Sequence, residues 1–115
     1  MSLTDNQTRE RIRELNDAFR KTLDPALGRT MLTAGVSALP SDVLAMAIRK
    51  VATFDAFGAD NDPHGEHDFG AFDLAGHTFF FKIDCYDLTL EFGSEDPTNP
   101  AKTTRVLTLM LAEEY

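Results

Sequence analysis

The strongest constraint on the fold is an alternation of side chains between residues 77 and 86. The odd positions carry the apolar set Phe79, Phe81, Ile83 and Cys85, and the even positions carry Phe80, Lys82, Asp84 and Tyr86. Because successive side chains of a strand point to opposite faces, the odd set predicts a face that packs in the core. Residues 69–74 read as a second strand, and Ala75-Gly76 supplies the turn of a β-hairpin.

A first helix is predicted near the N-terminus, followed by a short strand. Thr4 and Gln7 have the spacing of a capping box. An apolar stripe follows at helical spacing, formed by Ile12, Leu15, Phe19 and Leu23. Asp24-Pro25 ends this helix, because the residue before a proline avoids the helical conformation. Residues 29–36 then predict a strand with a bend at Gly35.

A second helix is predicted to begin at Ser41 or Asp42, either of which can cap it, and to end near Phe57-Gly58. Its apolar face holds Val43, Ala47, Ile48, Val51 and Phe54. The last element, 103–115, fits either a strand buried on both faces or a helix, and we favour the strand. The chain is therefore predicted to be a single α+β domain, with two helices packed on one face of a mostly antiparallel sheet of three or four strands.

The charge of the chain is unevenly distributed. The 115 residues have a net charge of −8, yet residues 54–100 hold eleven acidic residues and a single basic one, Lys82. This balance argues against direct binding of nucleic acid, which requires a basic surface. A field of one sign attracts a basic partner or cations, although a plain solvated surface gives the same composition.

One acidic segment, 60–70, has the side chains of a metal site. Its candidate ligands are Asp60, Asp62, His64, Glu66, His67 and Asp68. Carboxylates suit hard cations, and imidazoles suit zinc or manganese. The segment does not fit the EF-hand loop, whose twelfth position would be Ala71, nor the zinc-protease motif, because its two histidines are three residues apart. A structural role is the alternative, since Asp and Asn side chains stabilise turns by bonding the backbone.

A second candidate site is an acidic surface on the predicted sheet and the loop that follows it. It consists of Asp73, Asp84, Asp87, Glu91, Glu95 and Asp96. Together with the 60–68 segment these carboxylates would form an extended row of negative charge. Such a row imitates the phosphates of nucleic acid and would fit a basic groove on a protein.

Several runs of residues carry a resemblance to a known family. These runs are DNDPHGEHDFG at 60–70, FKIDCYD at 81–87, GSEDPTNP at 93–100 and TRVLTLMLAEEY at 104–115. They are similar to a family of small proteobacterial proteins of unknown function, often encoded on plasmids and other mobile elements. The similarity extends from about Met31 onward. The family has no established activity, so the resemblance implies a bacterial intracellular setting and no catalytic residue.

These observations lead to a functional prediction with two alternatives. We expect a non-enzymatic acidic binding module whose partner is a basic protein or nucleoprotein complex. The specific form of this expectation is an inhibitor of nucleic-acid-handling defence machinery of the anti-CRISPR or anti-restriction kind. A metal-dependent hydrolase using the 60–68 segment is one alternative, with a divalent metal as its only cofactor. A protein that merely dimerises is the other. No apolar run is long enough to cross a bilayer and no signal region is recognised, so we expect a cytoplasmic protein.

Overall fold

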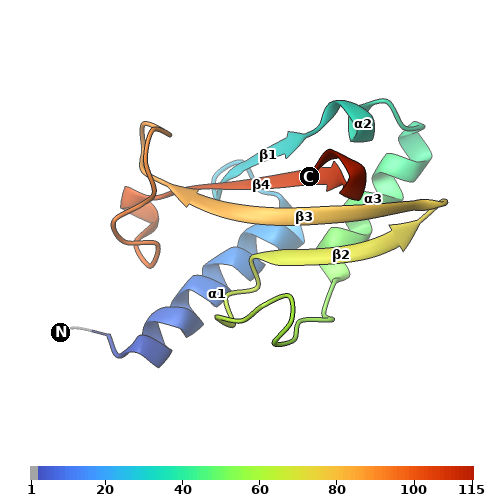
Figure 1. Cartoon of the computed structure of the whole chain (residues 1–115). Helices are drawn as coiled ribbons and strands as arrows, with labels where there is room; N and C mark the ends of the chain where they lie inside the picture. Colours follow the sequence, from blue (N-terminus) through green and yellow to red (C-terminus); the bar gives the residue numbers. More distant parts are fainter. Residues whose placement is uncertain (1–2) are drawn as a thin grey trace.

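The computed structural model describes residues 3–115 and has an α+β fold (Figure 1). The elements are α1 (Asp5–Thr22), β1 (Arg29–Leu32), α2 (Ala34–Ser37), α3 (Ser41–Thr53), β2 (Phe69–Leu74), β3 (His77–Tyr86) and β4 (Thr104–Leu111), with short 3₁₀ turns at Pro100–Lys102 and Ala112–Glu114. The four strands form one mixed sheet in the order β1-β4-β3-β2. The predicted fold class is confirmed.

The β2–β3 hairpin forms one side of the sheet, with β2 as its edge strand, and has the predicted boundaries. Phe69 pairs with Lys82 and Leu74 pairs with His77, so the turn is Ala75-Gly76, with positive φ at both residues. On its other side β3 pairs with β4 in an antiparallel register, and β1 joins β4 in parallel. The predicted last strand is confirmed, and it ends in the turn at Ala112–Glu114 rather than continuing to the C-terminus.

The core lies between the odd face of β3 and the two long helices. Phe79 and Phe81 are fully buried there, together with Phe19 from α1 and Val51 from α3. β4 contributes the alternate residues Leu107, Leu109 and Leu111 to the same cluster. Figure 1 shows α1 and α3 on one side of the sheet, as the apolar stripes predicted. Half-buried Cys85 belongs to the same face of β3.

The ends of α1 follow from its sequence. Thr4 is the N-cap, and its side chain and that of Gln7 bond each other's backbone N–H groups, which confirms the capping box. At the other end Leu23 takes a left-handed conformation, with φ 52°, and its N–H donates to the Phe19 carbonyl. The helix therefore ends at Thr22, just before the predicted Asp24-Pro25 stop.

Three local predictions are wrong. The predicted strand 29–36 ends at Leu32, and the short helix α2 replaces its second half, because Glu114 accepts hydrogen bonds from the Gly35 N–H and the Thr33 hydroxyl. The helix α3 begins as predicted, but its N-cap is Pro40 and no side chain caps it. It also ends at Thr53, before the predicted 57–58, and Phe54 is extended.

The connection from β3 to β4, residues 87–103, is called the β3–β4 loop below. It extends beyond the end of β3 that lies opposite the hairpin turn (Figure 1). The start of β2 and the 58–68 segment lie at the same end of the sheet, because Phe69 pairs with Lys82 near the end of β3. Within residues 3–115, no helix combines the length and the apolar character needed to cross a bilayer.

Candidate protein-binding site

The first half of the β3–β4 loop is folded around one carboxylate. Asp87 Oδ1 accepts hydrogen bonds from the N–H and hydroxyl of Thr89 and from the N–H of Glu91, at 3.2, 2.9 and 3.1 Å. The Asp87 N–H donates to the Phe92 carbonyl at 2.8 Å. The Thr89 hydroxyl, and after it the backbone donors, hold the pKa of Asp87 below its usual value. Asp87 therefore fixes the shape of the loop and has little capacity left for a partner.

The same part of the loop exposes large apolar side chains. Leu88 is 63% exposed, Leu90 is 37% exposed and Phe92 is 70% exposed. A groove of about 500 Å³ runs between Leu88, Phe92, Glu95 and Lys102. Single exposed apolar residues are common on protein surfaces, but Leu88 and Phe92 line one groove and exposed Leu90 lies between them in the chain, so the three form an apolar cluster of the kind that marks interaction sites.

The second half of the loop is also held by its own polar groups. Asp96 accepts hydrogen bonds from the N–H and the hydroxyl of Thr98, and the hydroxyl is the main reason that the pKa of Asp96 lies below its usual value. The Thr103 hydroxyl donates to the Asp96 carbonyl at 2.9 Å and lies 2.7 Å from the Ser94 hydroxyl. Like Asp87, Asp96 stabilises a turn.

The six residues of the predicted acidic surface therefore do not form one continuous surface, because two stabilise turns, two are exposed on the loop and two lie on strands. Glu91 and Glu95 are exposed on the loop, and neither joins an ion pair among residues 3–115. Asp84 lies near the loop but pairs with Lys82 at 3.0 Å. Asp73 is distant, because it pairs with Thr78 next to the hairpin turn at the opposite end of β3.

A small cleft of about 210 Å³ joins this end of β3 to the 58–68 segment. Three of its lining residues are acidic, namely Glu66, Asp68 and Asp84, and Cys85 lies beside them. Burial, and then the negative charge of Asp68, raise the pKa of Glu66. Burial likewise raises the pKa of Asp68. The two predicted acidic sites thus share one cleft in which the carboxylates repel one another.

Within the 58–68 segment, Asp62 has a structural position. It is buried, and its carboxylate accepts hydrogen bonds from the N–H groups of Glu66 and His67 at 3.0 and 3.2 Å. Its own N–H donates to the Gly58 carbonyl. These bonds are the turn-stabilising contacts that the sequence offered as the alternative to a metal site.

Contacts to α1 fix the segment against the rest of the molecule. His67 Nδ1 lies 3.0 Å from the Asp17 carboxylate, and its ring stacks on Phe57 with centroids 3.9 Å apart. Asn16 donates to the Glu66 carbonyl at 3.0 Å, and Arg13 donates to the Gly65 carbonyl at 3.3 Å. Although burial alone would raise it, hydrogen bonds from Arg20 and His67 lower the pKa of Asp17.

The predicted metal ligands do not converge. Asp60 and His64 are exposed, while Asp62 and His67 are engaged with the backbone and with α1. Among residues 3–115, no three His, Cys, Asp or Glu side chains are placed to hold a metal ion together. Metal binding by this segment stays a prediction, and the contacts that the structure shows are structural ones.

The exposed apolar cluster and the α1 partners were not among the residues that sequence reasoning selected. Asp17 lies 50 residues from His67, so no local pattern joins them. Leu88, Leu90 and Phe92 follow each other at alternate positions after β3. That alternation is a signal that the sequence does carry. Apolar residues in an acidic loop outside any strand have no core to pack against, and they therefore indicate an exposed apolar surface.

The comparisons with known proteins identify the family but no activity. A family model described as a protein of unknown function, DUF3768, matches residues 32–114. The chain belongs to this family. The matched DUF3768 region contains β2, β3, β4, α2, α3 and the β3–β4 loop, whereas α1 and all but the last residue of β1 precede it. No curated protein matches the chain, and no solved structure does.

The family match agrees with the predicted resemblance in extent, since it begins within a residue or so of Met31. The bacterial source, the mobile-element setting and the diagnostic value of the individual motifs stay predictions. Because the DUF3768 description states no function, any functional conclusion rests on the site itself.

Proposed function

We propose that the protein is a non-enzymatic binding module that docks the β3–β4 loop onto a basic surface of a partner protein. One observation carries this proposal: Leu88, Leu90 and Phe92 are exposed together on a loop whose backbone Asp87 holds in place. Aromatic and apolar anchors at the centre of an interface supply most of its binding energy. Phe92 is the largest of the three and the most exposed, so we assign it the central anchor.

The rigidity of the loop favours binding. Ordering a flexible segment at an interface costs about 0.5–1.5 kcal/mol for each immobilised side chain. The carboxylate of Asp87, the Asp87–Phe92 backbone bond and the Ser94 N–H bond to the Cys85 carbonyl hold this loop in place before any partner arrives. The loop therefore loses less entropy on docking than an open loop of the same composition.

The charges around the apolar cluster define the partner. Glu91 and Glu95 are exposed beside it, and the acidic cleft of Glu66, Asp68 and Asp84 lies at the same end of β3. Complementary charges at a rim accelerate association and select the partner more than they add affinity. A partner with an apolar depression surrounded by lysine and arginine fits this surface.

The proposed partner belongs to the machinery that handles nucleic acid. Proteins that hold phosphates carry basic grooves, which an acidic surface can occupy in place of nucleic acid. The specific form of the proposal is an inhibitor of a bacterial defence complex of the anti-CRISPR or anti-restriction kind. The net charge of −8 supports recognition of the protein part of such a complex, because nucleic acid itself would be repelled.

Affinity purification from bacterial cells tests the proposal, with nuclease treatment and mass spectrometry of the captured proteins. The variant Leu88→Ser/Phe92→Ser should lose the partner. The control is Met46→Ser, which removes an apolar side chain that is 52% exposed on α3. Glu91→Lys/Glu95→Lys should weaken capture and reduce its salt dependence.

The proposal requires a partner that is retained by the control and lost from the double loop variant. Capture that is the same for the wild-type protein and for Leu88→Ser/Phe92→Ser would show that the β3–β4 loop is not the binding surface. A partner whose binding is insensitive to both salt and the Glu91→Lys/Glu95→Lys change would contradict the electrostatic part of the proposal.

A further inference from the structure

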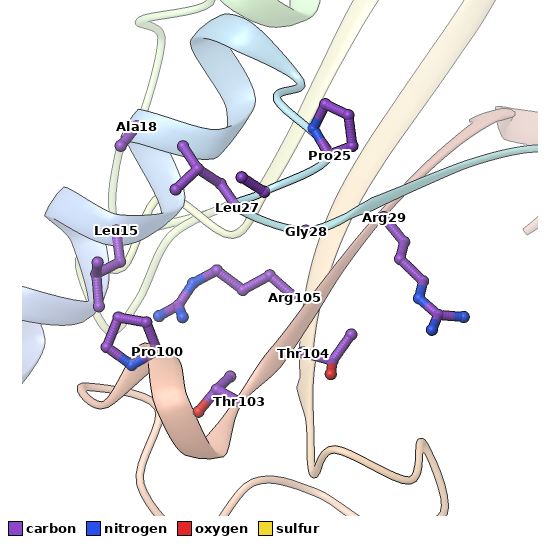
Figure 2. Close-up of a pocket in the computed structure, with 11 residues that line it drawn as sticks. Leu15, Ala18, Pro25, Leu27, Gly28, Arg29, Pro100, Thr103, Thr104 and Arg105 are labelled. Atoms are coloured by element: carbon purple, nitrogen blue, oxygen red, sulfur yellow. The ribbon is translucent and has the colours of Figure 1, made fainter.

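A second pocket lies on the other side of α1 from the 58–68 segment. It has a volume of about 220 Å³ and is enclosed by α1, the turn at 24–28, and the starts of β1 and β4 (Figure 2). Its walls are mainly apolar, with Leu15, Ala18, Leu27 and Pro100 among them. In Figure 2 the side chain of Arg105 extends from β4 toward the middle of these residues.

Arg105 is an unusual component of such a pocket. The residue is only 3% exposed, and burial lowers the pKa of its guanidinium. Its Nε donates to Asn16 Oδ1 at 2.8 Å, and Nη2 donates to the Pro97 carbonyl at 2.6 Å. Both acceptors are neutral. None of the ion pairs among residues 3–115 includes Arg105.

A buried cation without a carboxylate is costly, because its charge is removed from water and not matched by another charge. The two hydrogen bonds use Nε and Nη2, and Nη1 donates to no acceptor within the described chain. A guanidinium offers five N–H donors in a fork that matches a carboxylate. Arg105 therefore retains donors for an anion that approaches from the pocket.

The charge of the pocket is opposite in sign to the net charge of the chain. Its eleven lining residues include no acidic residue, and the charge that faces it is the guanidinium of Arg105, because the side chain of Arg29 lies on the opposite face of the sheet and extends away from the pocket (Figure 2). The chain as a whole has a net charge of −8. A local excess of positive charge in an acidic protein is typical of a site that receives an anion.

We infer that this pocket binds a small organic carboxylate, with its carboxyl group on the Arg105 guanidinium and a short apolar chain against Leu15, Leu27 and Pro100. The volume agrees with this class of ligand. At about 220 Å³ the pocket is smaller than the roughly 300–1,000 Å³ of ordinary ligand pockets, which suits a molecule smaller than ordinary cofactors. This inference is independent of the proposed protein-binding function.

The probe is butyrate, with butyramide as the neutral molecule of the same shape, both added at constant ionic strength. Thermal unfolding and ¹H–¹⁵N NMR titration are the measurements. Butyrate should raise the melting temperature saturably and shift the resonances of residues 15–18 and 103–105, and butyramide should do neither.

The test variant is Ala18→Leu, which extends a side chain into the pocket without removing any contact of Arg105. The matched control is Ala45→Leu, at an exposed position of α3. We expect at least about a tenfold weaker response to butyrate in Ala18→Leu and an unchanged response in Ala45→Leu. An equal effect of butyramide, an unsaturable effect of butyrate, or an unchanged response in Ala18→Leu would overturn the inference.

Discussion

At the scale of single residues, the 58–68 segment shows that two aspartates close together in the sequence can have different roles. Asp60 and Asp62 are alike as candidate metal ligands, but the structure separates them. Asp62 is buried and accepts hydrogen bonds from two backbone N–H groups, whereas Asp60 is exposed. Sequence spacing cannot make this distinction, because it depends on which side of a turn faces the protein.

Replacement of Asp62 by alanine should therefore destabilise the protein. The change leaves the Glu66 and His67 N–H groups without their acceptor, and we expect a loss of about 1–3 kcal/mol in the free energy of unfolding. Asp60→Ala is the control and should change stability by no more than about 0.5 kcal/mol. Urea denaturation measures both. Equal effects of the two substitutions would mean that the backbone bonds of Asp62 do not hold the segment.

At the scale of secondary-structure elements, the end of α3 depends on a residue from another helix. Arg20 of α1 is buried, and its Nη1 donates to the carbonyls of Val51, Ala52 and Phe54 at 2.7, 3.3 and 3.0 Å. A cation near the C-terminal carbonyls of a helix is favourable. This contact accounts for a helix that ends at Thr53, although the apolar pattern continues beyond it.

Removal of the Arg20 guanidinium should weaken the contact between α1 and α3 and lower the free energy of unfolding. Arg20→Met leaves the carbonyls at the end of α3 unsatisfied and takes one hydrogen-bond donor from Asp17, so we expect a loss of about 3 kcal/mol or more. Lys21→Met is the control, because Lys21 is the exposed neighbour on the same turn. The measurement is the midpoint of denaturant unfolding. A loss below about 1 kcal/mol for Arg20→Met would contradict this role.

The elements that sequence reasoning located correctly are those with a strong local signal. The hairpin was predicted to the residue, because side-chain alternation and the Ala75-Gly76 turn agree. The capping box at Thr4 located the start of α1. The replacement of the second half of the 29–36 strand by α2 could not be predicted, since Glu114, about 80 residues away, supplies its hydrogen bonds. The arrangement of the 58–68 segment could not be predicted for the same reason, because it depends on long-range pairs such as Asp17 and His67.

At the scale of the whole molecule, the acidic excess is not spread evenly over the surface. Some carboxylates stabilise turns, as Asp87 and Asp96 do, and their charge is already matched by hydrogen-bond donors. Others meet in the cleft at the end of β3, where burial raises the pKa of both Glu66 and Asp68. The second group costs stability in the free protein, and a basic partner would relieve that cost.

The pH dependence of stability should reveal this cost. A carboxyl group whose folded pKa is raised binds its proton more tightly in the folded state, so its penalty is present above that pKa and disappears as the pH falls below the unfolded value of about 4. Glu66→Gln/Asp68→Asn removes the penalty. Because both side chains are partly exposed, we expect a modest rise of about 2–4 °C in melting temperature at pH 7 and none at pH 3.5.

The control for this prediction is Glu10→Gln/Asp60→Asn, which removes the same total charge from exposed positions. High salt should reduce the difference between the cleft variant and the wild-type protein, because salt screens repulsion among the carboxylates. A cleft variant that is less stable than the wild-type protein at pH 7 would show that Glu66 and Asp68 make favourable contacts when ionised. In that case the acidic cleft would be a structural feature, and the basic partner would have to be recognised by the β3–β4 loop alone.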